Sequence, residues 1–369
     1  MRWSVILIGL AVPLLLTATV FAAPGGSGSN FLGIMGNNAS NLSSASDGSK
    51  ALQQQISEQT GSDGIVQTAD AAKPRTHNIV MSAEKLDNGL LAYKMVEYKI
   101  LDGKKTADIT KNYPKVATIP GPTIVLTEGD TVNLIVQNHL GSGIVGVHVH
   151  GVHYDINSDA TLMHINGVAD EGATPGSPYT FHWVAGPGTA GSWPYHDHTF
   201  GGLNGAENKG LFGMVIVNPA SGEVNAFDGH TASSVSINAI KKDFVIYMGD
   251  DAFWATEILP DGTQKALWTN PTLVAANGQY VRFNIIALGT DLHQFKLNGY
   301  SWLSPGTETT INSANIGPLE NHVFVIKAKV GTSTYEDLQT TNHLEGMKGK
   351  FKVTPAGGSS IASPVPAPF

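Results

Sequence analysis

The run Gly210-Leu211-Phe212-Gly213-Met214-Val215-Ile216-Val217-Asn218-Pro219 is a short apolar segment closed by a turn, and it has a weak echo at Gly346-Met347-Lys348-Gly349-Lys350-Phe351-Lys352-Val353-Thr354-Pro355. Further out, Glu128-Gly129-Asp130-Thr131-Val132 is echoed by Asn277-Gly278-Gln279-Tyr280-Val281. The echoes keep their order and lie 136 and 149 residues apart by subtraction. Such self-similarity indicates two copies of one structural unit.

Short runs rich in β-branched and aromatic residues follow one another from about Arg75, separated by Gly, Pro, Asn and Asp. They predict strands at 93–100, 123–126, 131–137, 179–183 and 214–218. The 42 glycines and a charged fraction of 14% fit a β-rich protein with many turns. We therefore predict an all-β fold of the sandwich or barrel type.

The N-terminus has the features of a secretory signal. A basic Arg2 precedes an apolar run from Val5 to Leu16, and the small residues Ala22 and Ala23 follow. The apolar run is shorter than the roughly 20 residues that a membrane span requires, although an uncleaved anchor is the alternative. We expect an exported protein, either secreted or periplasmic, or tethered to a membrane by this segment.

Composition divides the rest of the chain. Residues 1–23 are the predicted signal peptide, and 24–75 form a Gly-, Ser- and Asn-rich leader that is predicted to be flexible. Residues 76–222 and 238–356 are the predicted β-domains, with a boundary near Ala220 to Lys241. The Gly/Ser/Pro-rich tail, 357–369, is predicted to be disordered.

Charge and cysteine content limit the function classes. The formal net charge is -8, and the sequence has no run of Lys or Arg of the kind that binds a phosphate backbone. We therefore expect no nucleic-acid partner. The sequence contains no cysteine, which excludes a disulfide and any thiolate ligand for a metal. Small-molecule or ion chemistry is favoured.

Two histidine couples carry the clearest chemical signal. They are His148-Val149-His150 and His196-Asp197-His198. On a β-strand, residues i and i+2 project from the same face, so each couple presents two imidazoles side by side. One couple alone fits an ordinary polar strand face, but two couples with similar neighbours favour a metal site. Imidazole binds copper, zinc, iron and nickel, so the couples do not select the metal.

The motifs around these couples resemble those of the multicopper oxidases, in particular the small two-domain laccases. The similar segments are Ile119-Pro120-Gly121-Pro122, His148-Val149-His150-Gly151-Val152-His153-Tyr154-Asp155, Trp193-Pro194-Tyr195-His196-Asp197-His198 and Gly210-Leu211-Phe212-Gly213. The resemblance covers about Thr76 to Pro355. It implies two cupredoxin-like Greek-key β-sandwich or barrel domains in tandem, copper as the cofactor, and a homotrimer.

The resemblance also implies ligands. His148 corresponds to the ligand of a type 2 copper, and His150, His196 and His198 correspond to ligands of a type 3 pair. In the second copy, the internal repeat aligns His148-Val149-His150-Gly151 with Lys296-Leu297-Asn298-Gly299, so two cluster ligands are replaced. The type 1 site lacks its cysteine, and its remaining candidates are His293, His343 and Met347.

Several alternatives stay open from the sequence. His153 is either a fifth ligand or proton carrier, or a hydrogen-bonded loop residue. His293, His343 and Met347 form either a His2Met copper site or remnant packing, and His148, His150, His196 and His198 are either metal ligands or unmetallated remnants. The function that we expect is that of an exported copper oxidoreductase that acts on a small molecule. A separate cupredoxin is the candidate electron donor. The alternatives are a copper-buffering protein and a structural cupredoxin subunit.

Overall fold

The computed structural model describes residues 73–161, 171–198 and 209–356. Within these residues almost all of the regular elements are β-strands, as predicted, and the all-β fold is confirmed. The predicted signal segment, nearly all of the predicted leader and the predicted tail lie outside the described residues. None of the described helices is long and apolar enough to cross a membrane.

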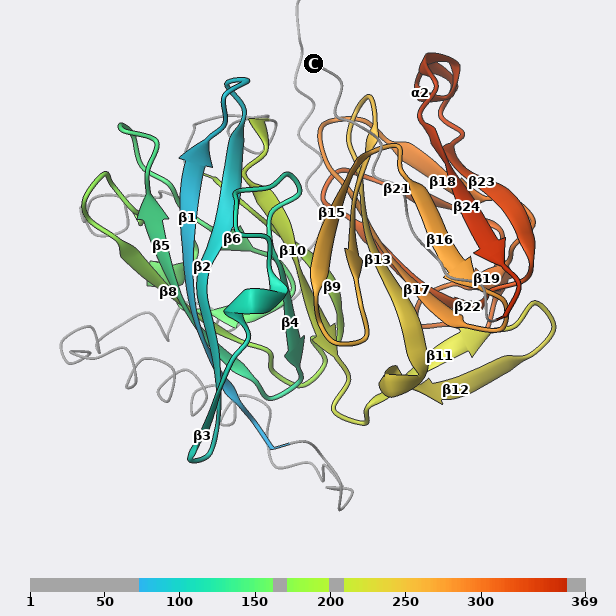
Figure 1. The fold of residues 1–369 in the computed structure, drawn as a ribbon, viewed down its shortest axis with the longest axis horizontal. Helices are drawn as coiled ribbons and strands as arrows, with labels where there is room; N and C mark the ends of the chain where they lie inside the picture. The colour runs from blue at the N-terminus through green and yellow to red at the C-terminus, as the bar shows by residue number, and fades with distance from the viewer. Residues whose placement is uncertain (1–72, 162–170, 199–208, 357–369) are drawn as a thin grey trace, which may run out of the picture. The chain divides into compact units, whose positions relative to one another are not determined.

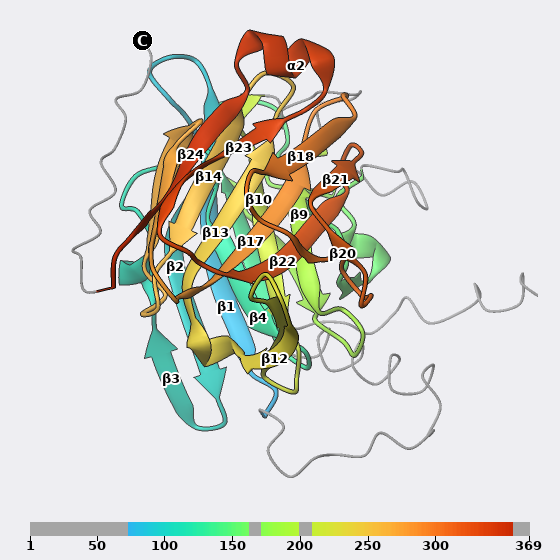
Figure 2. The ribbon, with the colours of Figure 1, turned by 90° about the vertical axis from the view of Figure 1, so that its right-hand side faces the viewer.

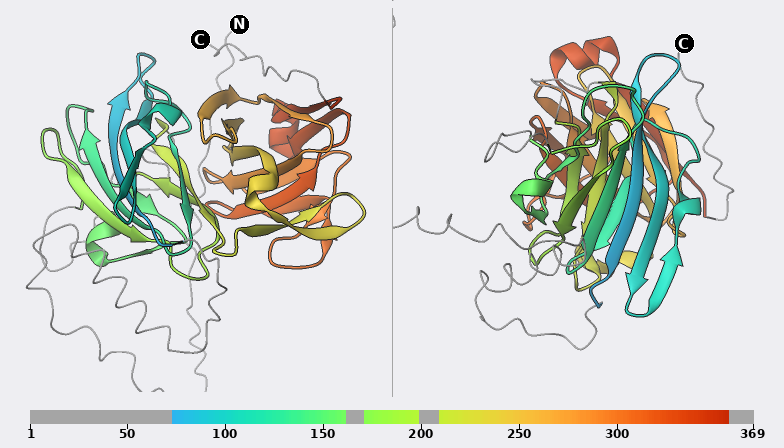
Figure 3. Two further views of the ribbon diagram at one scale, coloured as in Figure 1. Left: turned by 60° about the horizontal axis from the view of Figure 1, so that its bottom comes forward. Right: turned by 90° about the vertical axis from the view of Figure 1, so that its left-hand side faces the viewer.

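The first group of strands, here called the first half, forms two sheets, which can be followed in Figures 1 and 3. One has the order β3-β2-β1-β5-β8-β7 and the other β4-β10-β9-β6. The strands are β1 (Thr76–Lys85), β2 (Leu91–Asp102), β3 (Lys105–Asp108), β4 (Thr123–Thr127), β5 (Thr131–Asn138), β6 (His148–Val149), β7 (His153–Tyr154), β8 (Tyr179–Val184), β9 (Gly191–His196) and β10 (Phe212–Asn218).

The second half repeats this arrangement, with sheet orders β12-β11-β22-β17-β13-β14-β15 and β16-β24-β23-β18-β21 and a small β19-β20 pair. Its strands are β11 (Glu223–Phe227), β12 (Ala232–Ser236), β13 (Ile240–Met248), β14 (Phe253–Ile258), β15 (Gln264–Thr269), β16 (Thr272–Ala276), β17 (Tyr280–Ala287), β18 (His293–Leu297), β19 (Trp302–Leu303), β20 (Thr310–Ile311), β21 (Ser313–Ile316), β22 (Asn321–Lys327), β23 (Gly331–Asp337) and β24 (Lys348–Thr354).

The two halves share one topology. The order β3-β2-β1-β5-β8 of the first half is matched by β15-β14-β13-β17-β22, and β4-β10-β9-β6 is matched by β16-β24-β23-β18. The matching extends to strand direction, because β1–β5 and β4–β10 are parallel pairs and so are β13–β17 and β16–β24. The weak echo in the sequence therefore corresponds to a repeated sandwich.

Alternation of side chains explains why these segments form half-buried strands. In β24 the lysines at 348, 350 and 352 are exposed, whereas Gly349, Phe351 and Val353, which alternate with them, are buried. Trp183 and Tyr195 lie in the apolar core of the first half, and Trp302 and Tyr335 in that of the second. Each predicted strand run falls inside a strand of the structure.

Two features were not anticipated. The segment predicted as a boundary, near Ala220 to Lys241, contains β11 and β12, which extend the larger sheet of the second half. A short helix, α2 (Thr340–Glu345), follows β23, as Figure 2 shows. Short 3-10 turns occur at Thr110–Asn112, Ile156–Ser158 and Ile237–Ala239. The division into domains 76–222 and 238–356 stays a prediction.

Candidate metal centre

Strands β6 and β9 bring the two histidine couples together. They pair in antiparallel register, with His148 opposite His196 and Val149 opposite Tyr195. His150 and His198 each follow two residues after those histidines, and the His150 N–H donates to the carbonyl of Pro194 at 3.0 Å. Because side chains alternate along a strand, all four imidazoles project from one face of the sheet.

The rings lie close enough to share a metal ion. The centroid of the His148 ring is 4.9 Å from that of His150, 5.5 Å from that of His196 and 5.3 Å from that of His198. The Nε2 atoms of His150 and His196 are 3.3 Å apart. One ring nitrogen from each of His148, His150 and His196 lies within 4.8 Å of the others. Metal–nitrogen bonds of about 2.0–2.1 Å at tetrahedral angles separate donor atoms by roughly 3.3 Å.

Two of the rings are fixed from behind by main-chain carbonyls. His148 donates from Nδ1 to the carbonyl of Asp159 at 2.7 Å, and the Asp159 carboxylate Oδ1 is 3.2 Å away. His196 donates from Nδ1 to the carbonyl of Asp197 at 3.1 Å. A carbonyl only accepts, so each Nδ1 carries the proton and each Nε2 is left as a lone-pair donor for a metal.

Burial favours the neutral rings that bind metals. It lowers the pKa of His148, brings the pKa of His150 down to about 4 and brings the pKa of His196 down to about 3. These imidazoles therefore need lose no proton on binding a metal near neutral pH. His198 is exposed, so the site has an open side.

His153 does not join the group. It is exposed on β7, where it lies opposite Val184. Its neighbour Tyr154 points the other way and places its ring 5.9 Å from that of His148. Sequence reasoning missed Tyr154, although strand alternation after His153 was a usable signal.

In the second half, the candidates His293, His343 and Met347 are not gathered around one point. His293 and Met347 are fully buried. The His343 side chain is 45% exposed, and its Nδ1 lies 3.5 Å from Oε2 of Glu336. Asn342, rather than His343, reaches His293, with Nδ2 3.4 Å from Nδ1 of the imidazole.

The register shows what replaces the histidine couples in the second half. On β18 and β23, Lys296 lies opposite Glu336 and Leu297 opposite Tyr335, as His148 lies opposite His196 and Val149 opposite Tyr195. Lys296 and Glu336 thus stand at the positions of His148 and His196. Two residues further along each strand, Asn298 and Leu338 stand at the positions of His150 and His198. The predicted alignment of Lys296 and Asn298 agrees with this register.

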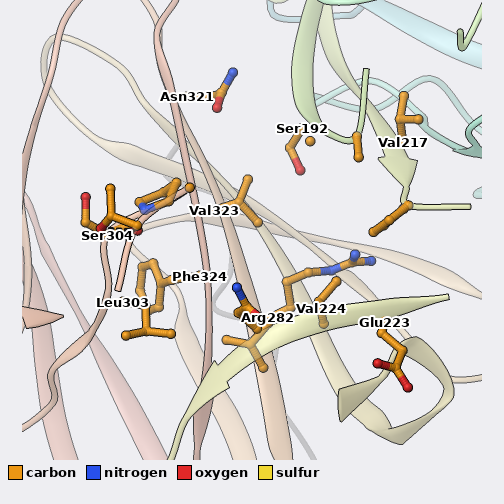
Figure 4. A pocket seen from close by; sticks show the side chains of 18 of the residues that line it. Ser192, Val217, Glu223, Val224, Arg282, Leu303, Ser304, Asn321, Val323 and Phe324 are labelled. Carbon is orange, nitrogen blue, oxygen red and sulfur yellow. Dashed lines mark hydrogen bonds between the residues drawn. The ribbon is translucent and has the colours of Figure 1, made fainter. Parts of the chain in front are cut away.

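A separate cavity lies away from the four histidines. It has a volume of about 550 Å³ and is lined by residues of β9, β11 and β22, by Arg282 of β17 and by neighbouring loops (Figure 4). Its one guanidinium, that of Arg282, is already paired with the carboxylate of Asp243 and with the side chain of Asn218. The cavity therefore offers no uncompensated cation to an anionic ligand.

Residues 94–222 match the family model of the multicopper oxidases, described as "Multicopper oxidase". That segment includes both histidine couples. The resemblance predicted from the motifs is confirmed, and copper is the metal that it implies. The absence of cysteine from the sequence fits the absence of a type 1 site.

This chain is similar to several curated proteins, two of which show how much of their length it matches. A probable nitrite reductase–hydroxylamine oxidoreductase fusion protein of Kuenenia stuttgartiensis is 29% identical over 64% of this chain and 28% of its own length. A copper resistance protein A of Escherichia coli is 28% identical over 36% of this chain and 21% of its own length. The chain therefore matches only about a quarter of each relative.

A crystal structure of a multicopper oxidase has a similar fold. It superposes with a TM-score of 0.51 at 19% identity, covering 76% of this chain and 88% of that one. At this identity the likeness concerns the fold, which agrees with the paired cupredoxin-like sandwiches expected from the sequence.

Proposed function

We propose that this chain, with its multicopper-oxidase segment at residues 94–222, is an exported copper oxidoreductase whose copper is held by His148, His150, His196 and His198. One observation carries the proposal: three ring nitrogens of the first half lie within 4.8 Å of one another. The donor set fits copper, for which imidazole is a suitable ligand.

The chain's own groups have defined roles in this proposal. Carbonyls of Asp159 and Asp197 hold the rings of His148 and His196 with Nε2 presented to the site. Exposed His198 marks the side from which a small molecule reaches the centre. Bound copper would supply one-electron redox chemistry and open positions for that molecule. The substrate classes proposed are dioxygen, a nitrogen oxide or a phenol.

Electrons must enter this centre without a thiolate-bound copper in the same chain, because the sequence contains no cysteine. A separate electron-transfer protein, such as a small blue-copper protein, is the proposed donor. The predicted signal segment supports export. A homotrimer remains a proposal by analogy, and sedimentation of the purified chain at the mass of a monomer would contradict it.

The function is tested by copper analysis combined with turnover. Purified full-length chain should bind copper with type 2 signals in electron paramagnetic resonance, and it should consume dioxygen or nitrite when an added cupredoxin or chemical donor supplies electrons. His148→Ala with His196→Ala should remove both copper and turnover. Lys296→Ala, at the matching position of the second half, is the control and should leave both unchanged.

A copper-buffering role is the second candidate. It is favoured by the copper resistance protein among the relatives and by the exposed edge of the site at His198. Copper that binds to His148 and His196 but supports no consumption of dioxygen or nitrite with any donor would select this role. A chain that binds no copper would leave only a structural function.

A further inference from the structure

A buried polar cluster lies in the second half, at the adjacent ends of β18 and β23 and next to α2 (Figure 2). It consists of His293, Asp337 and Asn342, which are at most 1% exposed. His293 donates from Nδ1 to Oδ2 of Asp337 at 2.7 Å, and the Asn342 amide donates to the same oxygen at 2.8 Å. Oδ2 of Asp337 thus accepts two hydrogen bonds, whereas Nε2 of His293 is buried without a hydrogen-bond partner among the described residues.

The other carboxylate oxygen is equally well paired. Oδ1 of Asp337 accepts the N–H of Gln294 at 2.8 Å and the N–H of Gln339 at 3.0 Å. The Asp337 N–H donates to the carbonyl of buried Met347 at 3.2 Å. Asp337 therefore joins the start of β18, the start of α2 and the residue before β24. A buried carboxylate with this many donors is stabilised without any metal ion.

The repeat shows which part of this cluster is shared and which is new. In the first half, Asp197 follows His196 as Asp337 follows Glu336, and its Oδ1 accepts the N–H of Gly146 at 2.9 Å. The aspartate is thus a common feature of both halves. The position matching His293, three residues before Lys296, is Val145 in the first half, three residues before His148. The imidazole is therefore particular to the second half.

We propose that this cluster occupies the position of a blue-copper site but does not bind metal, because Asp337 stands where the thiolate is required and Asn342 where the second imidazole is required. A blue-copper site requires two His, one Cys and a weak axial ligand such as Met. His293 supplies one imidazole, and Met347 joins the cluster through its main-chain carbonyl, which accepts the Asp337 N–H. The hydrogen bonds of Asp337 take the place of a metal in joining β18, α2 and the residue before β24. The inference stands whether or not the first half binds copper.

Restoring the two missing ligands tests the proposal. The full chain carrying Asp337→Cys and Asn342→His should bind one copper more than the unchanged chain and should acquire the intense blue absorption of a copper–thiolate bond. The matched variant with Asp337→Ser and Asn342→His has the same steric demand but no thiol, and it should stay colourless. A folded Cys/His variant that takes up no copper would overturn the proposal.

A second measurement decides the matter if the double variant fails to fold. In the chain carrying His148→Ala and His196→Ala, isothermal titration with cupric ions should detect no site that depends on His293. Copper bound there and lost on His293→Gln would overturn the metal-free reading. In the metal-free unchanged chain, His293→Ala should lower the melting temperature by on the order of 10 °C, because it leaves a buried carboxylate short of a partner. A shift of less than about 2 °C would contradict the structural role.

Discussion

The two halves of this molecule share a strand framework and differ in the chemistry placed on it. Tyr195 and Tyr335 occupy matching positions, and their hydroxyls donate to the carbonyls of Pro122 and Pro271, each at 2.6 Å. One residue further, the framework holds His196 in the first half and Glu336 in the second. The requirements of folding are therefore met by residues that alternate with those that decide metal binding.

The consequence is that a metal site can be gained or lost on this framework without rebuilding it. In the first half, β6 and β9 and the residues just after them carry four imidazoles on one face. In the second half, the same positions carry Lys296, Asn298, Glu336 and Leu338, and Asn298 donates to Glu336 and Thr334 instead of facing a metal. The following predictions test how far this separation extends.

The largest effect on copper content is expected when histidines are placed at the matching positions of the second half. A chain carrying Lys296→His, Asn298→His, Glu336→His and Leu338→His should bind additional copper, because the shared register places those side chains as in the first half. Copper content after gel filtration measures it. The same four positions changed to Gln serve as the control, and a folded four-histidine variant without extra copper would break the comparison.

The framework itself should respond alike in both halves. A Cβ on Gly213 would lie 2.2 Å from the Tyr195 ring, and one on Gly349 would lie 2.1 Å from the Tyr335 ring. Gly213→Ala and Gly349→Ala should therefore each lower the free energy of unfolding by about 1–3 kcal/mol through overpacking. Denaturant unfolding gives both values. A large effect in one half with none in the other would show that the framework is not shared.

Acid should weaken both halves over the same range of pH. Burial raises the pKa of Asp130, but hydrogen bonds from His77 and Arg75 outweigh burial and hold the pKa at about 2, below the ordinary 3.8. Burial likewise raises the pKa of Asp337, and His293 and Asn342 hold it at about 2. A lowered folded pKa gives stability that is complete above the unfolded pKa and is lost as pH falls toward the folded pKa.

Each aspartate should thus contribute about 2 kcal/mol to the free energy of unfolding above roughly pH 4. This contribution should be lost as the pH falls toward about 2. Urea unfolding across this range should show a steep acid limb. Asp130→Asn and Asp337→Asn should each flatten it by a similar amount. An acid limb that neither substitution changes would contradict the assignment.

The smallest effect is expected when one group that orients a ligand, the Asp159 carboxylate beside His148, is changed. Asp159→Asn removes the carboxylate 3.2 Å from Nδ1 of His148 but keeps the main-chain carbonyl at 2.7 Å. Copper affinity should fall roughly tenfold, which is the lower end of the range expected when a group that orients a metal ligand is removed. Competition with a chelator measures it. Asp155→Asn is the control, because Asp155 makes no described contact with the histidines, and an equal loss in both variants would remove the proposed role of Asp159.

Much of this arrangement was accessible from the sequence because it rests on local periodicity. The period of two placed His148 and His150 on one face, and the repeat placed Lys296 and Asn298 at their counterparts. Spacing alone failed at His343, because a helical turn at Thr340–Glu345 directs Asn342 inward and leaves His343 exposed. The pairing of Asp337 with His293 joins residues that are 44 positions apart, and no local sequence pattern predicts it.

The most direct test of the account is an anomalous-scattering map at the copper edge for crystals of the full chain loaded with cupric ions. We expect density beside the imidazoles of His148, His150, His196 and His198, and none within the cluster of His293, Asp337 and Asn342. Density in the second-half cluster, or no density beside the first-half histidines, would contradict it.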